Sequence, residues 1–141
     1  MKNALIGGAG LVGSAAAYLI GGWDMCVLVF FLFMGIDYIT GVTCALVFHK
    51  SPKTETGGVE SRAGLKGLIR KGCMMLVVVI AHLLDELGGY HVFRDGACYA
   101  FIFNEGISIV ENMTLMGVYI PAPVRKALEV ISQKGDKDNG L

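Results

Sequence analysis

The chain has 141 residues, of which 54% are hydrophobic and only 17% are charged, and 12 basic residues balance 12 acidic ones. The length suits a single domain, and the composition is too apolar for a typical soluble domain, so it indicates a membrane protein. The balanced charge and the lack of a basic stretch interleaved with aromatic residues argue against nucleic-acid binding. Four cysteines stand singly in apolar runs, which predicts small buried side chains and no disulfide framework or metal site.

The first predicted helix covers residues 4–22 and carries no charged side chain. A signal peptide is disfavoured because another long apolar segment follows at once and no polar domain comes after it. Small residues recur at every fourth position, and such a ridge lets membrane helices pack closely. The alternative is a helix weakened by glycine in which the small residues have no packing role. The ridge consists of Ala9, Gly13, Ala17 and Gly21.

The second predicted helix covers residues 25–48 and contains a single charged residue, Asp37. At about 100° per residue, Asp37, Thr40 and Gly41 share one face. This face could line a pore or dock on another helix, or it could hold one buried acid that bonds a neighbouring hydroxyl such as that of Thr40. We favour contact with another helix.

The connector over residues 49–71 is polar, and the third predicted helix covers residues 62–87. Four basic side chains at the start of this helix are expected at headgroup level, where they attract anionic lipids and set the topology. They are Arg62, Lys66, Arg70 and Lys71. Near the other end, His82, Asp85 and Glu86 are close in sequence. They predict a hydrogen bond from the histidine to a carboxylate rather than a metal site.

The last long predicted helix covers residues 95–120 and combines the length of a membrane span with an unusual number of polar groups. The 23 residues from Cys98 to Ile120 would extend about 34 Å, enough to cross a bilayer. Five polar side chains lie within an arc of roughly 120° and should face protein or water, because an acid exposed to lipid is costly. They are Asn104, Glu105, Ser108, Glu111 and Asn112.

These segments predict an all-α fold, a small polytopic membrane bundle of four hydrophobic helices in one domain over residues 1–134. A short amphipathic helix at 123–133 and a loose polar tail at 135–141 complete it. If all four helices span, every Lys and Arg except Arg94 lies on one side, which places both termini in the cytoplasm. If the first helix lies flat, the N-terminus is outside and only Lys2 changes sides.

No catalytic motif is present: the sequence lacks G-x-S-x-G, H-E-x-x-H and P-loop patterns, so we expect neither an enzyme nor a cofactor. Residues 8–13 match the dinucleotide pattern G-x-G-x-x-G. The alternating strands and helices that this pattern requires do not follow it.

The polar string of the last helix resembles the toxin secretion/phage lysis holin family. The similarity covers roughly residues 25–130. In this helix it rests on Phe101, Asn104, Glu105, Ser108, Ile109, Glu111, Asn112, Gly117 and Pro121. Earlier features that agree are Asp37 with Thr40-Gly41, the connector residues Ser61, Gly64, Gly67, Leu68 and Lys71, and Asp85. The chain departs from many members in its Gly/Ala-rich first segment.

The resemblance implies a protein that assembles as a homo-oligomer in the bacterial inner membrane and permeabilises it, so that an endolysin or toxin leaves without needing direct contact. The association or pore face would be Asp37, Thr40 and Gly41 together with the five polar residues of the last helix. Two alternatives stay open: a small cation channel or transporter subunit that uses intramembrane carboxylates, and a non-conducting antiholin or scaffold.

Overall fold

The structure is a computed structural model that describes residues 2–58, 60–127 and 130, with side chains described from residue 7 onward except at residue 9. Four long helices follow one another: α1 (Lys2–Ile20), α2 (Met25–Leu46), α3 (Ser61–Gly88) and α4 (Phe93–Leu115). A short helical segment at 122–127 follows, and the described residues contain no strand. The all-α prediction is therefore confirmed. The rest of the helix predicted at 123–133 and the tail at 135–141 lie largely outside the described residues.

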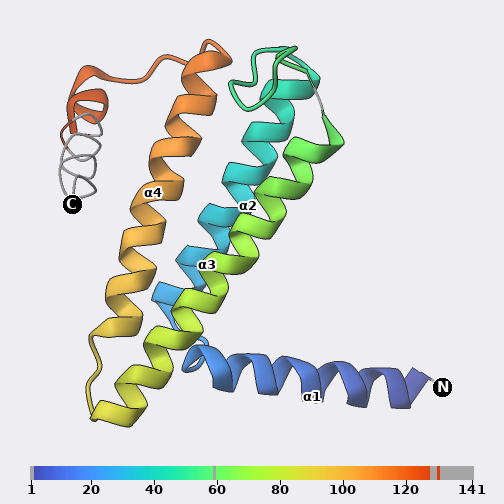
Figure 1. Ribbon diagram of the computed structural model, residues 1–141, viewed down its shortest axis with the longest axis vertical. Coiled ribbons are helices and arrows are strands. Elements are labelled where there is room, and N and C mark those ends of the chain that lie inside the picture. Colours follow the sequence, from blue (N-terminus) through green and yellow to red (C-terminus); the bar gives the residue numbers. More distant parts are fainter. Residues whose placement is uncertain (1, 59, 128–129, 131–141) are drawn as a thin grey trace.

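Helices α2, α3 and α4 form an elongated bundle, whereas α1 runs crosswise near the end at which α3 joins α4 (Figure 1). Two of the described helices, α2 and α3, are long and apolar enough to cross a membrane. The prediction of four hydrophobic spans is thus confirmed only in part. Helix α4 falls short because charged and amide side chains interrupt it. In α1 the apolar stretch among the residues searched is Gly10–Ile20, which is shorter than a span, and the helix points away from the bundle.

The turn between α1 and α2 explains this crosswise course. Gly21 and Gly22 both adopt positive φ angles, 85° and 97°, which favour glycine. A Cβ at Gly21 would lie 2.6 Å from Nδ1 of His82 in α3, so the turn sits directly against the bundle. Gly21 is therefore a turn residue and not part of a helical ridge, which corrects the predicted packing stripe. A Cβ added at Gly13 would meet nothing within 4 Å, Ala17 is half-buried, and the side chain of Ala9 lies outside the described set.

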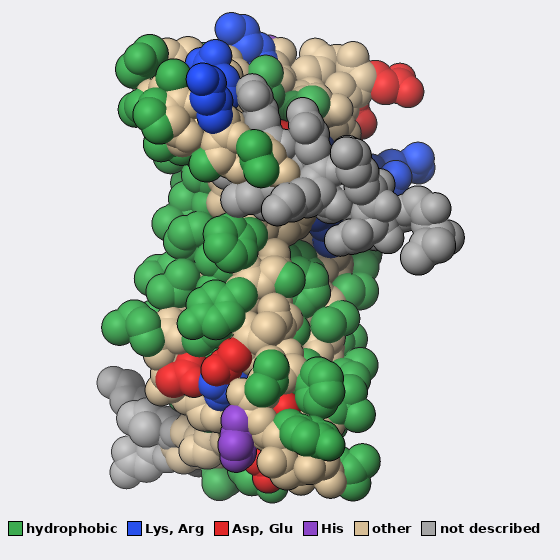
Figure 2. Space-filling model, turned by 90° about the vertical axis from the view of Figure 1, so that its left-hand side faces the viewer, with side chains coloured by type: hydrophobic (Ala, Val, Ile, Leu, Met, Phe, Trp, Pro, Cys, Tyr) green, Lys and Arg blue, Asp and Glu red, His purple; other side chains and the backbone are tan. Residues whose placement is uncertain are grey.

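The core of the bundle is apolar in its middle and in the half nearer the turn between α3 and α4. Phe30 and Val27 of α2, Val78 of α3 and Cys98 of α4 are each at most 1% exposed. The outer flank of α3 is apolar too. On the α4 side of the molecule, Figure 2 shows hydrophobic side chains between two ends at which charged side chains gather. The apolar residues exposed on this flank are Leu76, Val77, Ile80, Leu83 and Leu84. A belt of this kind is the surface expected of a protein surrounded by lipid.

Helix α4 ends at Leu115, five residues before the predicted end at Ile120. Gly117 adopts a left-handed φ of 85°, and the N–H of Val118 donates to the carbonyl of Met113 at 3.0 Å. This is a glycine C-cap, and the Pro121 that follows prevents any resumption of the same helix. Helix α4 also begins earlier than predicted, at Phe93.

Candidate functional site: a buried polar cluster

Lys71 stands at the centre of a polar cluster to which three helices contribute. Its Nζ donates to Oδ2 of Asp37 on α2 at 2.8 Å and also donates to Oε2 of Glu105 on α4. All three residues are buried, with Asp37 6%, Lys71 9% and Glu105 2% exposed. One cation therefore bridges two carboxylates that lie far apart in the sequence.

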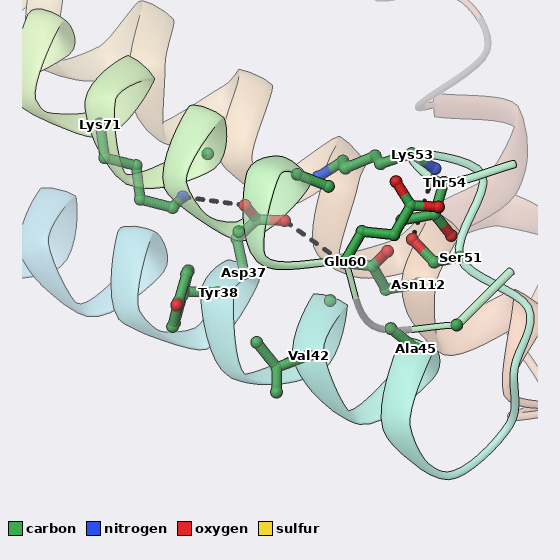
Figure 3. A pocket seen from close by; sticks show the side chains of 15 residues that line it. Asp37, Tyr38, Val42, Ala45, Ser51, Lys53, Thr54, Glu60, Lys71 and Asn112 are labelled. Atoms are coloured by element: carbon green, nitrogen blue, oxygen red, sulfur yellow. Dashed lines mark hydrogen bonds and ion pairs between the residues drawn. The ribbon is translucent and has the colours of Figure 1, made fainter. Parts of the chain in front are cut away.

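Asn112 and Thr40 extend this cluster toward the connector. Nδ2 of Asn112 donates to Oδ1 of Asp37 at 3.3 Å and to Oγ1 of Thr40 at 3.2 Å. Thr40 in turn donates its hydroxyl to the carbonyl of Ile36 at 2.9 Å. Gly41 lies beside this contact, because a Cβ there would be 3.6 Å from Nδ2 of Asn112. Figure 3 shows Lys71, Asp37 and Asn112 of the cluster, with dashed lines that join Lys71 to Asp37 and Asp37 to Asn112.

The cluster carries two formal negative charges and one positive charge in an interior that excludes most water. Removing charges from water is expensive, and mutual attraction offsets the cost only when each group finds partners. Each of the three charged groups does so here, which lets polar side chains stay buried between helices. Loss of Lys71 would leave both carboxylates without a cation, whereas loss of either carboxylate would leave Lys71 paired with the other.

Two hollows reach the cluster from the connector end. One, of about 90 Å³, lies beneath the connector between α2 and α3 and is drawn in Figure 3. The other, of about 270 Å³, lies between α3 and α4. Both are lined by Asp37 and Lys71, and both border small residues of α3, Ala63 and Gly67. The polar cluster is therefore approached from that end instead of being sealed in apolar side chains.

The predicted association face is divided by the structure. Asp37, Thr40, Glu105 and Asn112 come together, with Gly41 beside them, and Ser108 lines the larger hollow. Asn104 and Glu111 are exposed and lie outside the cluster. The reason is angular, since an arc of about 120° on α4 is wider than the strip that α2 and α3 can cover. Only the edge of the stripe that holds Glu105 and Asn112 faces the bundle, and the opposite edge with Asn104 and Glu111 does not.

Lys71 is the member of the cluster that the sequence-based prediction placed elsewhere. The sequence groups it with three basic residues at headgroup level, and those three, Arg62, Lys66 and Arg70, are indeed exposed. A signal was available, however. Lys71 precedes the buried Met74 and Val78 by three and seven residues, so it lies on the inward face of α3.

Asp85 organises the opposite end of the bundle. It is 3% exposed, and its carboxylate accepts hydrogen bonds from the backbone N–H groups of Val92 and Phe93 at 3.0 Å and of Arg94 at 2.8 Å. These are N–H groups at the start of α4, where no intrahelical acceptor exists. Asp85 thus starts α4 at Phe93 and does not serve as the partner predicted for His82.

Arg94 ties the α1–α2 turn to the same end. Its Nη1 donates to the carbonyl of Gly21 at 2.8 Å, and its Nη2 donates to Asp95 at 2.7 Å and to Asp24. Desolvation acts to raise the pKa of Asp24. The hydrogen bond from the Val27 N–H and the interaction with Arg94 outweigh it, so the pKa lies below its usual value. Among the described residues, no group of three His, Cys, Asp or Glu side chains could hold a metal ion.

Comparison with known proteins connects this architecture to a family. Residues 14–133 match the model of the bacteriophage holin family. The chain belongs to this family. The match includes the whole α2–α4 bundle and every residue of the polar cluster, and it confirms the resemblance drawn from the sequence.

Individual relatives agree with this assignment. The holin-family chain is 37% identical to a probable holin of Bacillus phage phi105 over 132 residues, which cover 89% of this chain and 90% of that protein. It is 35% identical to an uncharacterised protein of Clostridium perfringens strain 13 over 131 residues, 92% of this chain and 91% of the relative. No solved structure matches the chain significantly. Membership supports a membrane protein with a holin-like role, in a family that is not enzymatic.

Proposed function

We propose that this chain is a holin, which assembles as a homo-oligomer in the bacterial cytoplasmic membrane and permeabilises it so that an endolysin or toxin can leave. The observation that carries the proposal is the Lys71–Asp37–Glu105 cluster, held between helices whose outer surface is apolar. The released protein needs no direct contact with the holin, because passage requires only a hole.

The cluster suits a protein with a closed and an open arrangement. In the closed arrangement the charged groups of the cluster satisfy one another and are kept away from lipid, whereas Asn104 and Glu111 of α4 stay exposed. One chain cannot enclose water, since unpaired polar groups are not tolerated against lipid. Several chains that turn their clusters toward a common centre would exchange these internal bonds for water. Association would therefore give every polar group of the cluster a new partner, water, and all the groups would change partners together.

The charge distribution supports one orientation of the bundle. The connector and the start of α3 hold most of the described basic residues, whereas Arg94 lies at the opposite end. By the positive-inside rule, we place the connector and the C-terminal segment in the cytoplasm. The crosswise α1 favours the alternative in which the N-terminus lies at the outer face, which changes the side of Lys2 alone. Anionic lipids of the inner leaflet would then meet the exposed basic residues of α3.

The test is co-expression in a bacterium with an endolysin that cannot cross the membrane unaided. A holin produces abrupt lysis that depends on the endolysin. We compare Glu105→Gln with Glu111→Gln, because the two changes are chemically identical and only Glu105 lies in the cluster. Glu105→Gln removes the net negative charge of the cluster, so the cluster gains less free energy from hydration in the open arrangement. We therefore expect lysis to be delayed at least about twofold.

The matched Glu111→Gln variant should lyse with the timing of the unmodified chain. An inserted, abundant chain that never permits lysis would contradict the proposal and would favour an antiholin or scaffold. Steady cation-selective conductance without lysis would favour a channel subunit. The structure gives the channel little support, because the position between the two carboxylates is filled by Nζ of Lys71.

A further inference from the structure

The larger hollow has a charge pattern that the polar cluster does not explain. It measures about 270 Å³ and lies between α3 and α4 at the connector end. Lys71, Asp37 and Glu105 form its base and are already paired with one another. Its remaining ionisable lining residues are all basic: Lys53 of the connector and Lys66 and Arg70 of α3.

These three basic side chains have no counter-ion in the part of the chain that the structure describes. None of them forms an ion pair with another described residue. Lys66 and Arg70 are four residues apart on α3, so they are neighbours on one face of the helix. A Cβ added at Gly67, between them, would meet nothing within 4 Å, which leaves open space at the wall of the hollow. The hollow is therefore suited to an anion that comes from outside the chain.

The surroundings indicate what carries this anion. Leu65 and Ile69 lie beside the basic pair on α3, and each is 58% exposed. Charged groups beside an exposed apolar flank match a ligand that has both an anionic head and hydrocarbon chains. Basic hollows between membrane helices at the cytoplasmic end suit lipid headgroups in this way.

We propose that this hollow binds the phosphate group of an anionic phospholipid from the cytoplasmic leaflet. Lys66 and Arg70 donate to the phosphate oxygens, Lys53 adds a third positive charge, and the acyl chains lie along the exposed apolar flank of α3. This inference rests on the proposed function only in taking the connector end to be cytoplasmic. It adds a defined lipid site adjacent to the ion cluster, on the same helix as Lys71.

The experiment measures lipid binding to the full chain in a neutral detergent. The probes are dihexanoyl phosphatidylglycerol, dihexanoyl phosphatidylcholine and inorganic phosphate, each titrated against labelled protein by thermophoresis. The test variant is Lys66→Gln/Arg70→Gln. The control variant is Arg62→Gln/Lys126→Gln, which removes the same charge from exposed positions that do not line the hollow.

We expect the unmodified chain to prefer phosphatidylglycerol over phosphatidylcholine, whose choline group cancels the phosphate charge. The test variant should bind phosphatidylglycerol about 30-fold more weakly, and the control variant should stay within about twofold. Equal losses in the two variants would overturn the proposal in favour of diffuse attraction. Inorganic phosphate that displaces phosphatidylglycerol at similar concentration would overturn the assignment to a lipid.

A third variant keeps the test decisive if the glutamine variant misfolds. Lys66→Arg/Arg70→Lys keeps both charges and should retain phosphatidylglycerol binding to within about threefold. Loss of binding in this variant with unchanged helical circular dichroism would contradict a charge-based site. Because the assay contains no lysis step, a chain that binds the lipid but never lyses cells would refute the proposed function alone.

Discussion

Nζ of Lys71 lies 2.8 Å from Oδ2 of Asp37, across 34 positions of sequence, and so joins α3 to α2 through a buried ion pair. The same ammonium reaches Glu105 of α4, which makes Lys71 the residue on which all three helices of the bundle converge. The free energy of unfolding of the bundle should therefore depend on this side chain more than on any apolar contact nearby.

Replacing Lys71 with methionine should therefore destabilise the bundle strongly. The change keeps the length of the side chain but leaves two buried carboxylates facing each other without a cation. We expect a loss of about 3–5 kcal/mol in the free energy of unfolding, measured by denaturation in detergent micelles. Arg62→Met, on the exposed side of the same helix, serves as the control and should change stability by less than about 0.5 kcal/mol.

A triple variant separates charge from packing at this position. Lys71→Met combined with Glu105→Gln and Asp37→Asn removes all three charges while side-chain volumes change little. It should recover much of the lost stability, because neutral polar groups cost less to bury than unpaired charges. A charge-free cluster as unstable as Lys71→Met alone would show that the ammonium acts through packing.

Asn112 should contribute through its two hydrogen bonds to α2. Asn112→Leu leaves Oδ1 of Asp37 and the hydroxyl of Thr40 without this donor. We expect a cost of about 1–3 kcal/mol in the same unfolding assay. A double-mutant cycle with Thr40→Val tests the pairing, and additive effects of the two changes would mean that the Asn112–Thr40 bond contributes nothing.

Asp85 should matter for the start of α4. Asp85→Ala removes the acceptor of three backbone N–H groups, so we expect destabilisation of about 1–2 kcal/mol and fraying of the first turn of α4. Hydrogen exchange at residues 92–94 measures this directly. Glu86→Ala, one residue along the same helix and exposed, should leave exchange at these amides unchanged.

The lowered pKa of Asp24 predicts that stability depends on pH at the end of the bundle opposite the connector. Its pKa is lower in the folded chain than the unfolded value of about 3.9, so its contribution is complete above that value. The contribution is lost as the pH falls through the folded pKa. Thermal unfolding followed from pH 7 to pH 3 should show a smaller loss of stability for Asp24→Asn than for the unmodified chain. Parallel curves would refute a lowered pKa of Asp24 in the folded chain.

The sequence alone predicts the class of the protein and most of the residues that form the polar cluster. Long, mainly apolar segments predict helices close to the ranges at which α2 and α3 are found, because hydropathy and helical periodicity are local properties. The same periodicity marks Asp37, Glu105 and Asn112 as residues that avoid lipid. The polar string of the last helix resembles the holin family, and the family match confirms this resemblance.

Only the tertiary structure decided which polar groups meet. One step of about 100° around α3 separates Arg70, which is exposed, from Lys71, which is buried between two carboxylates. The same rotation separates Glu111 from Asn112 on α4. The local sequence pattern cannot tell which of two adjacent polar residues is buried, because that depends on where the two other helices of the bundle lie. The direction of α1 was likewise decided by the contact of its glycine turn with His82 and Arg94, whose positions are set by helices distant in the sequence.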